Sequence, residues 1–272
     1  MPELEPLPIV KISPEIDYQQ TILIEKLQQY VATRGAKLDY ESAEGLCAGL
    51  VAAWLYFKRT GCEANLIYKL EHALKWDLKS YLDSKAEQDD TMEMLINMLV
   101  FLSFDMFYRH AEKIGQDQIN RSFELLLGTP RVAKPEFKST LVFDHKTLAI
   151  LISKSIFEQK MVRFSNSKHV VGVMCSEGVY YMFDPSSKDG PRAFLTITAL
   201  TEALFASLGD SQTAMALNMQ AFDLDDVPVE PQKYREAEEY IQQLLADSEY
   251  RKSIAAHENF FDVAVKFKDF SL

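Results

Sequence analysis

Apolar positions divide the chain into a first part with helical periodicity and a second part with short, strand-like runs. In the first part, no proline occurs between Pro14 and Pro130, and no glycine between Gly61 and Gly115. These two residue types interrupt regular structure most strongly, so their absence favours long helices. Together with the apolar spacing, it predicts helices at about residues 18–33, 45–59, 64–83, 91–113 and 116–127.

Short β-rich runs follow the segment Gly128–Pro135, whose glycine and prolines mark the best internal boundary. Helices are expected near His145–Phe157 and Thr198–Leu208, and an acidic amphipathic surface helix at Glu230–Asp247. Helices first and a mostly antiparallel sheet afterwards define an α+β fold. The predicted strands are Thr140–Phe143, Met161–Phe164, His169–Cys175, Val179–Phe183, Ala193–Ile197 and Ala214–Phe222.

The chain is long enough to bury a full core as one large domain or as two small ones. Residues 1–15 contain four prolines and are predicted to form an extended arm. Residues 16–272 are then expected to form a single domain, with a helical half at 16–130 and a sheet half at 131–272.

The predicted helix at 45–59 is apolar nearly all round, so we expect it to be central and covered on several sides. It ends clearly. Lys58 and Arg59 place cations in its last turn, and Gly61 follows as a residue suited to the left-handed cap.

Composition narrows the classes of function. The net charge of -11 argues against nucleic acid and against an anionic membrane surface as partners. Three cysteines without close pairing indicate a reducing compartment. We expect no cleavable signal peptide at the N-terminus and no membrane insertion, because the most apolar run, Met94–Phe104, is too short to span a bilayer.

Common cofactor and metal motifs are missing from the sequence. It has no C-x-x-C or H-E-x-x-H pair, no G-x-S-x-G and no glycine-rich phosphate loop. We therefore expect neither a cofactor nor a metal.

Cys47, His169 and Asp184 are the one set of residues that can do chemistry together. A thiol in the first turn of a helix sits at the positive end of the helix dipole, which favours the thiolate. If Glu177 and Gly178 form a two-residue hairpin loop, Asp184 becomes the diagonal neighbour of His169 on one face of the sheet. A carboxylate there would steer the imidazole.

These residues resemble the papain-fold cysteine proteases, and among them the YopT/AvrPphB group of bacterial effector proteases. The segments that carry the resemblance are Gly45–Leu50 with Trp54, His169–Val173 and Tyr180–Pro185. The resemblance implies a papain-like domain with Cys47 as nucleophile, His169 as general base then acid, and Asp184 as its orienter. It also implies a virulence protein that is secreted into a host cell and acts on a host protein.

Two features depart from the papain pattern. Glu41 stands where such enzymes have a Gln or Asn that helps to bind the oxyanion, and an ionised acid would repel it. The segment Ser186–Gly190 after Asp184 and Pro185 is longer than usual, so we expect a different loop over the site and with it a different choice of substrate.

Alternatives to a protease stay open. A transglutaminase-like acyltransferase or deamidase uses the same three residue types. A catalytically silent binding protein could retain the fold. Each residue alone also has an ordinary role: a buried cysteine, a hydrogen-bonding histidine and a strand-to-turn aspartate. Cys62 and Cys175 are expected to be structural.

Overall fold

The computed structural model describes residues 20–33, 44–77, 79, 92, 133–209, 213–224 and 232–267. The predicted arm at 1–15 and the predicted helix at 116–127 lie outside the described residues. The predicted helix at 91–113 lies outside them too, apart from Met92, which is helical and buried.

Three helices of the first part are described: α1 (Gln20–Thr33), α2 (Glu44–Arg59) and α3 (Glu63–Lys75). The first two agree closely with prediction. The third ends earlier than the predicted 64–83, because Trp76 leaves the helix with extended backbone at ψ 134°. Asp77 follows, and its carboxylate accepts a hydrogen bond from the backbone N–H of Lys79 at 3.0 Å, which favours a new start over continuation.

The sheet has six strands in the order β1-β6-β2-β3-β4-β5, and every neighbouring pair is antiparallel. β1 begins inside the segment predicted as a boundary. β5 is shorter than the predicted Ala193–Ile197, because the Thr196 hydroxyl caps the following helix by accepting from the N–H of Ala199. The strands are β1 (Ala133–Phe143), β2 (Met161–Ser165), β3 (Val170–Ser176), β4 (Val179–Phe183), β5 (Arg192–Phe194) and β6 (Met215–Leu224).

The later helices connect and follow these strands. The predicted acidic helix is α10, and two short helices that the sequence pattern did not predict come after it. Asp247 ends α10 and caps the next helix with its carboxylate. The later helices are α8 (His145–Ser155), α9 (Ile197–Leu208), α10 (Arg235–Ala246), α11 (Ser248–Ala256) and α12 (Phe260–Phe267).

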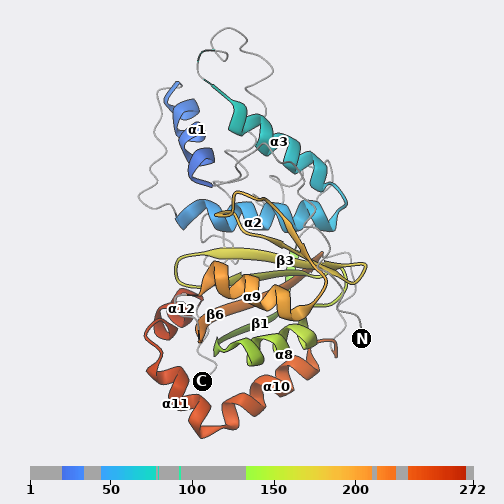
Figure 1. The fold of residues 1–272 in the computed structure, drawn as a ribbon, viewed down its shortest axis with the longest axis vertical. Coiled ribbons are helices and arrows are strands. Elements are labelled where there is room, and N and C mark those ends of the chain that lie inside the picture. The colour runs from blue at the N-terminus through green and yellow to red at the C-terminus, as the bar shows by residue number, and fades with distance from the viewer. Residues whose placement is uncertain are drawn as a thin grey trace, which may run out of the picture.

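Helices cover both faces of the sheet (Figure 1). One apolar cluster joins α1, α2 and α3 to side chains of β2, β3, β4 and β6. A second cluster joins the opposite face of the sheet to α8, α9 and the C-terminal helices. The predicted α+β fold, with the Cys47-bearing helix packed on a mostly antiparallel sheet, is confirmed.

α2 lies against β3 at a glycine. A Cβ built on Gly172 would come within 3.0 Å of Val51, 3.1 Å of Leu55 and 3.2 Å of Trp54. The helix therefore approaches the sheet at a point where a side chain would interfere. The Trp54 ring also stacks on Phe183 of β4, with 5.5 Å between ring centroids. These contacts fix which part of α2 faces which strand.

Candidate active site

Cys47 lies in the first turn of α2, as its fourth residue. Its side chain belongs to the apolar cluster between the helices and the sheet, and only 2% of the residue is exposed. The helix axis is set by the contacts at Gly172 and Trp54. The position of the thiol thus depends on how the whole helix packs on the sheet.

His169 is the residue immediately before β3, at the end of the turn that connects β2 to β3. The side-chain oxygen of Asn166 accepts hydrogen bonds from the backbone N–H groups of Lys168 (2.7 Å) and His169 (2.6 Å). The backbone N–H of Asn166 donates to the carbonyl of His169 at 3.0 Å. The turn is therefore closed by its own first residue.

Asp184 follows β4, and the β3–β4 hairpin has the register that the sequence predicted. Ser176 is opposite Val179, so Glu177 and Gly178 form a two-residue loop. Both have positive φ, 54° and 74°, as a type I′ turn requires. The register extends to place Asp184 diagonally across from His169.

The hairpin turn has a stabilising partner that explains an unfavourable residue. Glu177 is an uncommon choice for positive φ. The carboxylate of Glu158 accepts a hydrogen bond from the N–H of Glu177 at 2.6 Å, and one from the N–H of Gly178. These bonds hold the loop in the conformation that sets the phase of β4.

His169 and Asp184 are in direct contact. Nε2 of the ring lies 2.8 Å from Oδ1 of the carboxylate, and the two side chains are 14% and 8% exposed. Oδ1 also accepts from the backbone N–H of Ser186 at 2.8 Å. The carboxylate is therefore buried rather than open at the rim of the sheet, and it is held from two sides.

Burial alone would lower the pKa of His169, because it disfavours a charged ring. Hydrogen bonds with Asp184 and with the Cys47 side chain, and the charges of both groups, outweigh burial and raise the pKa to about 9. For Asp184, burial would raise the pKa, but the hydrogen bond and charge of His169, with the bonds from the Ser207 side chain and the N–H of Ser186, together outweigh burial and lower it. The pair thus favours imidazolium beside carboxylate.

The structure therefore brings the three predicted side chains together. The His169 ring uses Nε2 toward Asp184, so Nδ1 is the ring nitrogen left for the sulfur of Cys47. Glu41, and with it the predicted departure at the oxyanion position, lies outside the described residues.

The other two cysteines are placed differently. The thiol of Cys175 faces Glu158, with 3.6 Å between Sγ and Oε2, and burial together with the charge of Glu158 raises its pKa to about 11. It therefore stays protonated at neutral pH. Cys62 is the residue that precedes α3.

Sequence reasoning missed the residues that support the site. Asn166 and Ser207 touch His169 and Asp184 from a turn and from the end of α9. The string Ser165–Lys168 is typical of a turn, and this was the only available signal for Asn166. No pattern could have indicated Ser207, because its partner lies in a different element.

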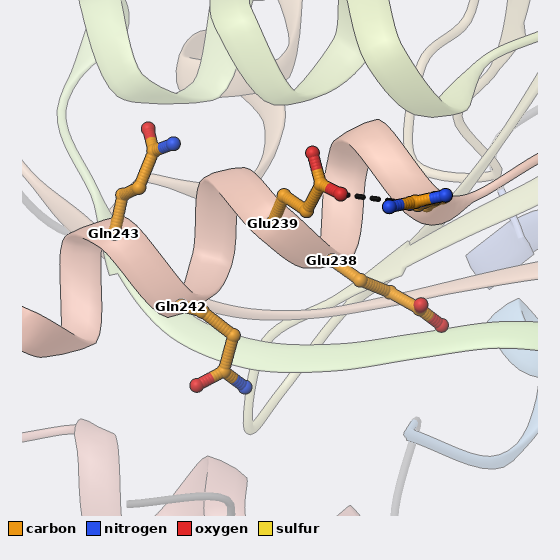
Figure 2. Close-up of a pocket in the computed structure, with 5 residues that line it drawn as sticks. Glu238, Glu239, Gln242 and Gln243 are labelled. Atoms are coloured by element: carbon orange, nitrogen blue, oxygen red, sulfur yellow. Dashed lines mark hydrogen bonds and ion pairs between the residues drawn. The ribbon is translucent and has the colours of Figure 1, made fainter.

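A pocket on α10 lies on the opposite face of the sheet from α2 (Figures 1 and 2). Figure 2 shows Glu239 and Gln243 projecting from one side of the helix, and Glu238 and Gln242 from the other. One arginine donates from Nε to Glu239 at 2.8 Å. The exposure of these side chains fits the solvated face expected of this helix. The lining residues are Arg235, Glu238, Glu239, Gln242 and Gln243.

Neither a metal site nor a membrane-spanning helix is found among the residues that the structure describes. Within that part of the chain, no three His, Cys, Asp or Glu side chains are grouped as a metal site would need. Within it, too, no helix has the length and apolarity needed to cross a bilayer.

Comparisons with known proteins give one distant similarity. No model of a known protein family matches the chain, and no curated protein matches it in sequence. Among solved structures, it is similar to the Pseudomonas avirulence protein AvrPphB, with 13% identity and a TM-score of 0.37. The match covers 66% of this chain and 93% of the other. At this distance, the chemistry proposed below depends on the geometry of the chain itself.

Proposed function

We propose that the chain is a thiol protease in which Cys47 is the nucleophile, His169 the general base and then acid, and Asp184 the group that orients the ring. The observation that carries the proposal is the His169 ring, which bonds to Asp184 at 2.8 Å and shares a hydrogen bond with Cys47. Nucleophile, base and orienter in mutual contact are the arrangement by which a thiol is activated.

The proposed reaction has two halves. With the proton of the thiol already on His169, the sulfur attacks the carbonyl carbon of a peptide bond. The imidazolium gives that proton to the leaving amine, and a thioester remains on Cys47. Water then attacks the thioester as the neutral His169 takes its proton, the acid product leaves, and the thiolate beside the imidazolium is restored.

The charge state of the ring supports this scheme. With a pKa of about 9, His169 is mostly an imidazolium at neutral pH. An adjacent cation favours the thiolate form of a cysteine, which is the nucleophilic form. Asp184 holds Nε2 and so keeps Nδ1 toward the sulfur.

We propose that residues 16–272 form one papain-like catalytic domain, in which the helical half and the sheet half share a core. The apolar cluster that unites α1, α2 and α3 with the sheet supports this division. The partner of this catalytic domain in the reaction would be a protein substrate. Secretion, delivery to a host cell and a host protein as substrate stay predictions of the family resemblance.

A second candidate function is a catalytically silent binding protein with the same fold. The observation that favours it is the burial of the proposed nucleophile, since Cys47 exposes only 2% of its surface. A nucleophile must be reached by substrate. The two candidates therefore differ in whether the thiol can react.

Chemical labelling followed by digestion of a peptide library would test the proposal. We expect iodoacetamide at neutral pH to label Cys47 faster than Cys62 or Cys175, as mass spectrometry of the intact and digested protein would measure. We expect new peptide N-termini from the library with wild type and with Cys175→Ala, and none with Cys47→Ala.

Each other outcome has a definite meaning. Slow labelling of Cys47 with no turnover would support the silent binding protein. Glutamine deamidation or transfer of an acyl group to an amine, without cleavage, would replace the protease by the acyltransferase class. Equal turnover by Cys47→Ala would overturn both enzyme proposals.

A further inference from the structure

Asn166 connects the turn that carries His169 to the end of α9. Its side-chain oxygen accepts from the N–H groups of Lys168 and His169 at 2.7 and 2.6 Å, and its Nδ2 donates to the carbonyl of Leu208 at 2.8 Å. The residue is 7% exposed. A buried amide with three of its four hydrogen-bonding positions used holds its neighbours in fixed relative positions.

The end of α9 offers an acceptor of the right kind. Leu208 is the last residue of the helix, and the last carbonyls of a helix lack partners within it. Asn166 supplies one of the missing donors. The residue before Leu208 is Ser207, whose side chain bonds to Asp184. One helix end therefore contacts both the His169 turn and the carboxylate that the ring binds.

We propose that Asn166 is the positioning residue for His169, which sets the ring against Asp184 by tying the β2–β3 turn to the end of α9. The catalytic meaning of this inference rests on the proposed function. The physical part of the inference, that one buried amide determines where the ring lies, is independent of the proposed function.

Other side chains could supply only part of these bonds. Aspartate could accept from the two N–H groups but could not donate to the carbonyl of Leu208. Serine could accept more weakly and at shorter reach, as it does in turns of this kind. Alanine could do neither. Asn166 is therefore expected to tolerate substitution poorly with respect to ring placement.

The test is an NMR titration of the His169 ring in the full chain carrying Asn166→Ala. The groups that face the ring are the carboxylate of Asp184 and the thiol of Cys47. We expect the pKa to fall from about 9 toward the ordinary 6.5, because the ring loses its alignment with Asp184. Asn166→Ser should give a His169 pKa between those of wild type and Asn166→Ala. If Asn166→Ala does not fold, the titration of Asn166→Ser tests the inference in its place.

Asn218→Ala is the matched control. Asn218 is fully buried, and its Nδ2 donates to Thr140 on β1 rather than to the His169 turn. We expect this variant to lose stability and to keep the raised pKa of His169. A folded Asn166→Ala or Asn166→Ser protein with an unchanged His169 titration would overturn the inference.

The titration needs no substrate, so its result is independent of the proposed protease. On a cleavable peptide, we expect Asn166→Ala to lower kcat by about 10- to 100-fold with KM little changed, because a small misplacement of a catalytic group acts on the chemical step. A lowered pKa in a chain without any turnover would uphold the positioning role and reject the protease. A loss confined to KM would count against the positioning role.

Discussion

The contact between His169 and Asp184 spans 2.8 Å, and both side chains are largely buried. Because its attraction is strongest between a charged ring and a charged carboxylate, its strength depends on the protonation of both groups. The pKa of the histidine is raised to about 9 and that of the aspartate is lowered. Protonation of the ring therefore stabilises the folded protein fully at pH values below the ordinary histidine pKa of 6.5. This contribution is lost as the pH rises through the raised pKa of about 9. The ionised carboxylate stabilises the folded protein fully at pH values above the ordinary aspartate pKa of 3.8. This contribution is lost as the pH falls through the lowered pKa of Asp184.

Asp184→Asn should remove most of this pH dependence. The amide cannot balance an imidazolium, so the pKa of His169 should fall, and turnover should drop by about 10²-fold or more. Urea unfolding at pH 6, 7.5 and 9.5 would measure the effect on stability. The difference in unfolding free energy from wild type should be largest at pH 6 and smallest at pH 9.5. A difference that is constant over this range would assign Asp184 a packing role only.

At the scale of the elements, the packing of α2 on the sheet is tight, because Gly172 lets the helix lie close to β3. The side chains of Val51, Trp54 and Leu55 occupy the space where a Cβ would stand. Close packing of this kind tolerates added atoms poorly.

Gly172→Ala should therefore lower the free energy of unfolding by about 1–3 kcal/mol, since the helix must move away from the strand. The same movement should slow the labelling of Cys47. A double-mutant cycle with Val51→Ala would check the cause, because Val51 provides the nearest atom, at 3.0 Å. We expect the double variant to lose less stability than the two single losses added together, and strict additivity would place the cause elsewhere.

Elements with local signals could be predicted from sequence. The β3–β4 hairpin followed from alternation of apolar residues and a two-residue loop, and its register was correct. The early end of α3 at Trp76 and the short β5 depended on capping side chains that the periodicity does not register. Patterns of spacing are blind to such single hydrogen bonds.

The contact between Cys47 and His169 could be proposed from the sequence, but the sequence alone does not determine it. Both residues were identified from motif and order, yet their contact depends on how α2 crosses the sheet, which Gly172 determines through packing. The bond from Asn166 to Leu208 joins residues 42 positions apart. Long-range contacts of this kind are the part that one sequence does not reveal.

At the scale of the whole molecule, α2 and the sheet are also joined by a buried group of charges. Nζ of Lys160 lies 2.8 Å from Glu136 on β1 and in contact with Asp223 on β6. Arg59, the last residue of α2, donates to Asp223 at 3.2 Å. Burial would raise the pKa of Asp223, but the hydrogen bonds from Lys160 and the N–H of Leu224, with the charges of Lys160 and Arg59, together outweigh burial and lower it. Asp223 is therefore charged and shared between the helix and the sheet.

Asp223→Ala should cost about 3–5 kcal/mol of unfolding free energy, because it removes the partner of two cations, one of them buried. Glu239→Ala is the matched control, since its pair with Arg235 is 56% and 70% exposed and should contribute under about 1 kcal/mol. Chemical denaturation of both variants would measure the difference. Equal losses would mean that Lys160 finds compensation from Glu136 alone.

Arg59 and Cys47 stand at opposite ends of one helix, about 18 Å apart at the ordinary rise per residue. Because the helix is stiff and held at its C-terminal end, a small tilt at that end displaces its N-terminal end sideways. Substitutions around the anchor, far from any bound peptide, would therefore tune the reach of the sulfur. Natural or engineered changes in reactivity are to be sought at that remote end as well as around the thiol.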